Sequence, residues 1–169
     1  MAVGAARELG AGEHVGLAGG GVSLQDSTRV FFTHNTVANN DSTATAGAAF
    51  APGSPNLSTA QPAGIVSHAH SSALKAVFDN PETPNAIRNL RGAYSRPDSL
   101  ANNIVWHNRS FYWQINPNDP ADFVLMPVIN PDGSGAVHWD LAVLGTANPA
   151  CLAPTTSILT TLNEQGCNY

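Results

Sequence analysis

The feature that most constrains this chain is an internal repeat. The stretch NTVANNDS, residues 35–42, aligns with NIVWHNRS, residues 103–110. Each reads Asn, two strand-forming residues, two further positions, Asn, one residue and Ser. Upstream of these, GVSLQDS (21–27) aligns with GIVSHAHS (64–71). A short unit of this kind cannot bury its apolar side alone, so the repeat predicts units that stack on one another.

The repeat divides the chain into unit A, residues 21–42, and unit B, residues 64–110, which carries a long insertion at about residues 75–99. A partial third unit is VHWDLAVLG, residues 137–145. Short apolar runs between polar turns indicate strands. In unit A the predicted strands are Val22–Leu24, Val30–Thr33 and Thr36–Ala38.

Asparagine recurs at the corners of the units, as Asn35 and Asn103 and again as Asn40 and Asn108. Asparagine tolerates left-handed backbone, and its side chain can bond to the equivalent residue one unit away. Three short strands per unit with polar corners predict a parallel β-helix. A β-sandwich of short strands fits the composition but does not explain the paired repeats.

The stretches HNTVANN and NNIVWHN resemble the right-handed parallel β-helix repeats of pectate-lyase-like secreted bacterial proteins, over about residues 16–111. The resemblance implies an all-β fold, a short right-handed parallel β-helix with a C-terminal cap. We expect one domain over residues 1–169. Its predicted parts are an N-terminal entry (1–20), the β-helix rungs with their insertion (21–111) and C-terminal strands with a cap (112–169).

Charge and hydropathy exclude several classes of partner. Only 11% of the residues are charged, Lys75 is the one lysine, and the net charge is −5, so nucleic acid is not expected as a partner. The sequence contains no run of about 18 apolar residues, so no membrane span is predicted. The start MAVGAARELGAGEHVG lacks the pattern of a signal peptide. The family resemblance nevertheless implies a secreted or cell-surface origin.

Cys151 and Cys167 form a disulfide or remain two free thiols.

Two histidines suggest a reactive site. In a strand over residues 65–70, His68 and His70 point to the same face, where two imidazoles can bind one metal ion. Asp26 lies at the matching place of unit A, and His138 and Asp140 form a second same-face pair. We predict these residues as the catalytic set. The alternative interpretation places both imidazoles on a solvated strand face.

Oxygen ligands are concentrated in the loops NPNDPAD and NPDGSG, which contain Asp119, Asp122 and Asp132. Carboxylate and carbonyl oxygens are the ligands of calcium, whereas imidazoles favour zinc. The predicted metal ligands are therefore these aspartates together with His68 and His70. We expect a divalent metal, with calcium favoured and zinc possible. The alternative is ordinary turn chemistry, since Asn, Asp, Pro and Gly form turns.

Aromatic residues follow the second asparagine corner, where Trp106, Phe111, Tyr112 and Trp113 lie close together in the sequence. They form a sugar-stacking or acyl-chain platform, or they cover the core near the C-terminal cap. The apolar stretches FYWQI and FVLMPVI are expected to wrap over the last rung as that cap. An open coil end exposes unpaired backbone, and we expect the N-terminal end of the coil to be thinly covered or buried in a homodimer contact.

Two functions fit these observations. One is a small metal-dependent hydrolase, in which metal-activated water opens an ester or lactone ring. The other is a non-catalytic carbohydrate-binding or structural β-helix module of a secreted or surface protein. The compact chain is also similar to small hydrolases that open acyl-homoserine-lactone rings, a resemblance that implies the first function and assigns no residues. We expect the hydrolase, with a lactone, an ester or a carbohydrate as partner.

Overall fold

Stacked coils of short strands make up most of the molecule. The computed structural model describes residues 20–164, 167 and 168, so residues 1–19 of the predicted entry segment lie outside the described residues. The first coil contains β1 (Val22–Leu24), β2 (Phe31–Thr33), β3 (Thr36–Ala38) and β4 (Asp41–Ser42). The second contains β5 (Ile65–His68), β6 (Ser99–Ala101), β7 (Ile104–Trp106) and β8 (Arg109–Asn116). The third contributes β10 (Leu141–Leu144) and β11 (Ile158–Leu159).

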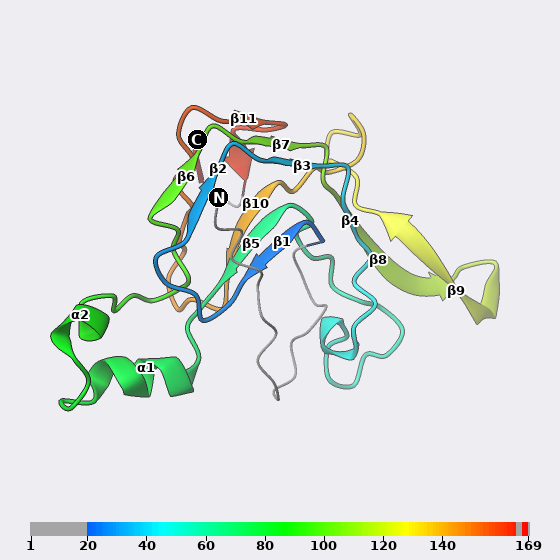
Figure 1. Cartoon of the computed structure of the whole chain (residues 1–169). Coiled ribbons are helices and arrows are strands. Elements are labelled where there is room, and N and C mark those ends of the chain that lie inside the picture. The colour runs from blue at the N-terminus through cyan, green and yellow to red at the C-terminus, as the bar shows by residue number, and fades with distance from the viewer. Residues whose placement is uncertain (1–19, 165–166, 169) are drawn as a thin grey trace.

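Equivalent strands of successive coils pair in parallel (Figure 1). Sheet 1 has the order β1-β5-β10, sheet 2 is β2-β6, and sheet 3 has the order β11-β7-β3. Val22 and Leu141 both pair with Ile65, one from each side. The pairing confirms the short parallel β-helix, the third unit and, within one residue, the strands predicted in unit A.

Corners of the coil repeat one backbone conformation. Between sheets 2 and 3, His34, Asn102 and Thr156 have φ values of 60°, 55° and 46°. After sheet 3, Asn39 and His107 adopt φ values of 56° and 54°. Positive φ is uncommon outside glycine, and asparagine, aspartate and histidine are the residues enriched there. His and Asn at these positions therefore let the first two coils turn sharply without glycine, whereas the third coil has Thr156 at the equivalent corner.

Asparagine ladders follow these corners, as the repeat predicts. Asn35 N donates to Asn103 Oδ1 at 2.9 Å, and Asn40 N donates to Asn108 Oδ1 at 3.2 Å. Asn103 and Asn108 are buried, at 1% and 0% exposure. Asn108 Nδ2 continues the second ladder by donating to Asp140 Oδ1 at 2.7 Å. Side-chain amides thus satisfy backbone groups at corners where the strand ladder is interrupted.

The core lies between the sheets and is aliphatic. Burying each Val, Leu or Ile side chain contributes about 1.5–3 kcal/mol. The buried cluster comprises Val37, Ile65, Leu100, Val105, Leu141, Val143, Leu152 and Leu159. Close stacking also explains Gly64, where an added Cβ would lie 2.1 Å from the Asp140 carbonyl oxygen. Only glycine lets the second coil approach the third at this point.

The insertion in the second coil contains two helices, α1 (Ser72–Asp79) and α2 (Asn85–Arg88), which project from the coil in Figure 1. The Pro-, Asn- and Arg-rich composition of residues 75–99 predicts the insertion but not its helices. Ser71 caps α1, because its side chain accepts a hydrogen bond from Leu74 N. Phe78 is the buried residue of α1, and its side chain packs the helix against the coil.

The second half of β8 leaves the coil and pairs antiparallel with β9 (Asp119–Pro127). The stretches FYWQI and FVLMPVI, expected over the end of the coil, thus pair with each other in a hairpin at its side (Figure 1). The remaining elements are short. They are the 3₁₀ helix η1 (Gly47–Ala49) and the antiparallel strands β12 (Asn163–Glu164) and β13 (Cys167–Asn168).

Candidate functional site

Strand β5 places one of the two predicted histidines beside a serine hydroxyl. His68 ends β5 and is half-buried, and its Nε2 lies 3.0 Å from Ser23 Oγ on the neighbouring strand β1. Parallel register places Ser23 opposite Val66, so His68 reaches it diagonally. An imidazole within hydrogen-bond distance of a serine hydroxyl can act as a general base toward it. Neither the repeat nor the His-x-His pattern pointed to Ser23.

His70 occupies a different environment, although only one residue separates it from His68. Its side chain is 1% exposed, and Nδ1 lies 3.8 Å from Asp26 Oδ1, beyond hydrogen-bond distance. The same carboxylate oxygen of Asp26 accepts the Ser71 N–H at 2.7 Å. The Phe78 ring packs edge-on against the imidazole. Burial lowers the pKa of His70 below its ordinary 6.5, against a smaller raising effect of Asp26.

His138 and Asp140 lie at another corner. His138 stacks on His107 with ring centroids 4.7 Å apart, and His107 stacks in turn on Trp106. Burial, followed by the neighbouring His107, lowers the pKa of His138. Asp140 is fully buried. Its carboxylate accepts hydrogen bonds from Asn108 and from Thr160 N, which makes it part of the second asparagine ladder.

The loop aspartates bond within their own turns. Asp119 Oδ1 accepts Ala121 N, and Asp122 Oδ1 accepts Phe123 N. Asp132 Oδ1 accepts Ser134 N, and hydrogen bonding to Ser134 lowers the pKa of Asp132. The Asp119 and Asp132 contacts, each to the N–H two residues on, are typical of Asx turns.

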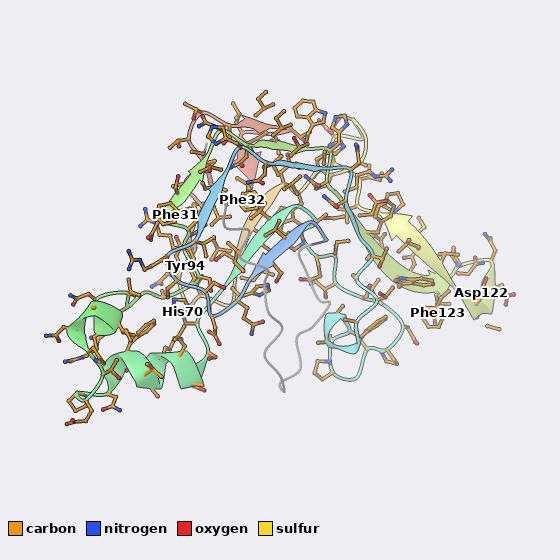
Figure 2. The ribbon with its side chains drawn as sticks, in the orientation of Figure 1. Phe31, Phe32, His70, Tyr94, Asp122 and Phe123 are labelled. Carbon is orange, nitrogen blue, oxygen red and sulfur yellow. A yellow bond between two sulfur atoms is a disulfide. The ribbon has the colours of Figure 1, made fainter. Side chains whose placement is uncertain are left out.

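The predicted metal ligands do not converge. Figure 2 shows His70 beside α1 on one side of the coil, and Asp122 with Phe123 on the hairpin at the other side. Within residues 20–164, 167 and 168, no group of three or more His, Cys, Asp or Glu side chains is placed to hold a metal ion. Calcium and zinc both take several protein ligands, and the described residues do not bring three of the predicted ligands together in one place.

The hairpin and the loop after η1 form an open aromatic pocket. We define the aromatic pocket by its lining residues, Thr45, Phe50, Pro55, Trp113 and Phe123, around a cavity of about 300 Å³. Ser58 fixes the loop to β8 in both directions, because its N–H donates to the Trp113 carbonyl and its Oγ accepts Trp113 N, both at 2.8 Å. Phe123 remains 40% exposed at the rim.

The indole ring of Trp113 contains a buried polar atom. Its Nε1 is buried and has no hydrogen-bond partner in the described part of the chain. The sequence analysis groups Trp113 with Trp106, but the structure separates them, with Trp106 on sheet 3 and Trp113 on the hairpin. Two short apolar and aromatic runs, 111–115 and 123–126, on either side of the turn NPNDPAD are the signal that could have predicted the hairpin. Phe50 gave no signal, because it lies in an irregular loop.

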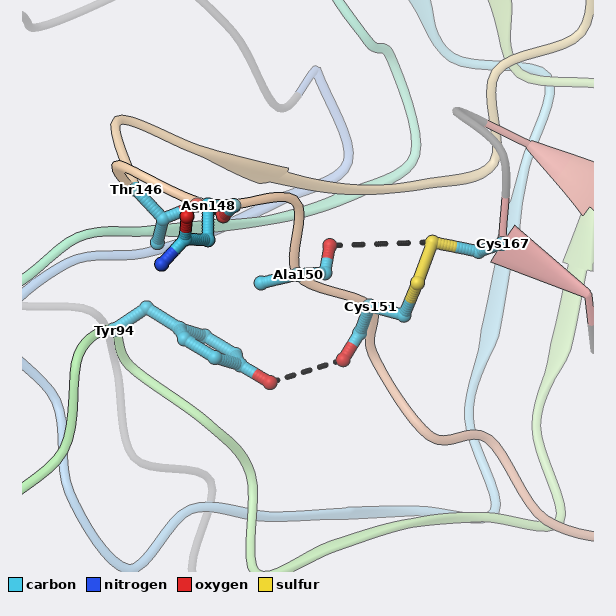
Figure 3. Close-up of a disulfide and its surroundings, with 6 residues drawn as sticks. All are labelled: Tyr94, Thr146, Asn148, Ala150, Cys151 and Cys167. Atoms are coloured by element: carbon cyan, nitrogen blue, oxygen red, sulfur yellow. Dashed lines mark hydrogen bonds between the residues drawn. A yellow bond between two sulfur atoms is a disulfide. The ribbon is translucent and has the colours of Figure 1, made fainter.

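A disulfide joins Cys151 to Cys167, with their Cα atoms 5.9 Å apart (Figure 3). Of the two alternatives that the sequence leaves open, the bonded pair is the one present. Tyr94 OH donates to the Cys151 carbonyl at 2.9 Å, and Cys167 Sγ lies 3.9 Å from the Ala150 carbonyl oxygen. Disulfides persist in oxidising compartments, so this bond points to an extracytoplasmic protein.

Comparison with known proteins adds no family. No family model, curated protein or solved structure matches the chain. None of the helices in the described residues has the length and apolar character needed to cross a membrane.

Proposed function

We propose that this chain is a non-catalytic, carbohydrate-binding segment of a β-helix protein, and that the aromatic pocket holds the sugar. The observation that carries the proposal is the convergence of Phe50, Trp113 and Phe123 on one open cavity. These rings come from an irregular loop and from both strands of the hairpin. Exposed aromatic rings gathered in one place are more informative about binding than scattered apolar residues.

The size and chemistry of the aromatic pocket suit a single ring. Its volume of about 300 Å³ is at the lower end of the range for small-molecule sites, which begins near 300 Å³. The C–H face of a sugar can lie on aromatic rings, whereas its hydroxyls need polar partners. The Thr45 hydroxyl supplies one such partner at the rim.

Affinity electrophoresis through gels that contain soluble polysaccharides tests the proposal. We expect one or more neutral or acidic polysaccharides to retard the chain. Trp113→Ala and Phe123→Ala should weaken retardation about tenfold or more, which corresponds to about 1.4 kcal/mol. Trp106→Ala is the matched control, because Trp106 is an exposed tryptophan outside the aromatic pocket. Equal losses in Trp106→Ala and Trp113→Ala, or no retardation by any polysaccharide, would contradict the proposal.

Ester or lactone hydrolysis is a second candidate function, favoured by the contact between Ser23 and His68. In that reaction the Ser23 hydroxyl would attack the carbonyl carbon while His68 takes its proton and passes it to the alcohol oxygen as the C–O bond breaks. Water would then attack the acyl-serine, release the carboxylic acid and restore the Ser23 hydroxyl. This route differs from the predicted metal-activated water, for which the described residues supply no cluster.

Hydrolysis assays separate the two routes. Turnover of short-chain esters and lactones is measured with and without a chelator, in the wild type and in Ser23→Ala and His68→Ala. The serine route predicts loss in both variants and no effect of the chelator, whereas the metal route predicts loss with the chelator. His34→Ala, which changes an exposed histidine on another corner, is the control. Absence of turnover in the wild type rejects both hydrolytic routes.

A further inference from the structure

The aromatic pocket has no charged residue in its lining. Thr45 is the one polar lining residue, and the others are apolar or aromatic. Two segments form the pocket, and the loop over residues 43–60 contains no Asp, Glu, Lys or Arg. The other segment is the hairpin, residues 109–127, whose charged residues are Arg109, Asp119 and Asp122. These three residues therefore decide which charges a bound sugar meets nearby.

The cation of the hairpin is already neutralised. Arg109 donates from Nε and Nη2 to the two carboxylate oxygens of Asp41, at 2.9 and 2.7 Å. Its guanidinium also lies over the Phe111 ring, 5.2 Å from the centroid. Four residues of extended strand separate Arg109 from Trp113, which is about 13 Å. This separation exceeds the Debye length of about 8 Å at physiological salt, so Arg109 contributes little positive potential at the aromatic pocket.

The two aspartates of the hairpin, in contrast, have no cation beside them. Asp122 adjoins Phe123 of the aromatic pocket in the sequence, and Figure 2 shows both residues together on the hairpin. Asp119 and Asp122 are exposed, and neither forms an ion pair with any residue that the structure describes. The rim near Phe123 therefore carries negative charge that the described residues do not compensate.

We propose that the aromatic pocket selects uncharged sugars over uronates and other anionic sugars, an inference that rests on the proposed function. A carboxylate bound there would leave water without gaining a cation, which is costly. The faces of aromatic rings carry negative partial charge, so they attract the C–H groups of a sugar and repel an anion. Asp119 and Asp122 add a repulsion that reaches a bound ligand at low ionic strength.

The hairpin aspartates act on the charge of a ligand and not on its ring. Selection should therefore depend on ionic strength, whereas the affinity for an uncharged sugar should not. The net charge of −5 adds a repulsion of the same sign over longer distances. Calcium would oppose this selection by bridging the carboxylates of protein and ligand, because carboxylate oxygens are its ligands.

Isothermal titration calorimetry with paired oligosaccharides, in the presence of a chelator, tests the selection. Oligomers of glucose, galactose and mannose are each compared with the oligomer of the corresponding uronic acid, so that the members of a pair differ at C6 alone. At about 10 mM salt, where the Debye length is about 30 Å, we expect each uronate to bind at least fivefold more weakly than its uncharged counterpart. At about 1 M salt the Debye length is about 3 Å, and the ratio should shrink.

The double variant Asp119→Asn/Asp122→Asn isolates the charge of the rim, because asparagine keeps the Oδ1 acceptors for Ala121 N and Phe123 N. We expect it to raise the affinity for uronates about threefold or more at low salt and to leave the affinity for uncharged sugars unchanged. Glu82→Gln/Asp98→Asn, which changes two exposed carboxylates outside the hairpin, is the control with the same net charge.

Two results would overturn the selection while leaving the carbohydrate site in place. One is uronates that bind as tightly as their uncharged counterparts at low salt, and the other is an equal effect of the two double variants, which would assign selection to net charge. Uronate binding that appears when calcium replaces the chelator, and that Asp119→Asn/Asp122→Asn abolishes, would likewise contradict the proposal. Absence of binding by every sugar rejects the proposed function itself.

Discussion

The asparagine ladders and the hairpin invert the usual relation between polarity and burial. At the ladders, Asn103, Asn108 and Asp140 are polar and lie at 0–1% exposure inside the coil. On the hairpin, Phe123 and Leu125 are apolar and face solvent. Buried polar groups and gathered exposed apolar groups are the two observations that carry information beyond ordinary core formation. The first region stabilises the coil, and the second is the region on which the proposed carbohydrate binding depends.

Burying the polar side chains of the ladders costs little free energy because they are hydrogen-bonded. Asn108 donates to the Val37 carbonyl and to Asp140, and it accepts from Asn40. A buried amide with its partners costs little, while one left without them costs about 1–3 kcal/mol for each group. The hairpin has no comparable requirement, since water covers its exposed side chains. Substitutions should therefore affect stability at the ladders and binding at the hairpin.

The largest expected effect is from Asn108→Ala. The change leaves Asp140 Oδ1, the Val37 carbonyl and the Asn40 amide without a partner that they now have, inside the coil. We expect the free energy of unfolding in urea to fall by about 3 kcal/mol. Asn118→Ala, at the exposed tip of the hairpin, is the control and should change it by less than about 0.5 kcal/mol. Equal effects would break the comparison.

The next effect concerns a buried polar residue that, unlike Asn108, lacks a hydrogen bond. His70 Nδ1 has no partner in the part of the chain that the structure describes, and its nearest charges are Asp26 and Lys75. Because burial lowers the pKa of His70 in the folded state, the unfolded chain binds the proton more strongly. Stability is therefore complete above pH 6.5 and decreases as the pH falls below it.

Urea unfolding at a series of pH values between 5 and 8 checks this expectation. His70→Gln should flatten part of the decline, and the lowered pKa of His138 contributes the rest in the same direction. The exposed His34→Gln serves as control. A decline that His70→Gln leaves unchanged would show that another group is responsible.

Sequence reasoning was sufficient for the coil because the coil is repetitive. Asn35 and Asn103 gave its register, and Val22–Leu24 gave its strand length. It failed where long-range geometry decides. The sequence predicts Asp140 as a same-face partner of His138. In the structure its carboxylate instead accepts a hydrogen bond from Asn108 of the preceding coil and completes the second asparagine ladder. Phe50 joins the aromatic pocket only through the pairing of its loop with β8.

The smallest expected effect on the free energy of unfolding is from Val124→Thr on the hairpin. Valine and threonine have nearly the same shape and both favour strands, so the change adds little more than a hydroxyl. On the half-buried edge strand water can bond to that hydroxyl, and we expect less than about 0.5 kcal/mol of change in the free energy of unfolding. The same change at Val105, which is 1% exposed in the core, places the hydroxyl where it must find a partner and should cost about 1–3 kcal/mol. If the two substitutions cost the same, the hairpin is part of the folding core, and its exposed apolar residues lose their meaning as a recognition surface.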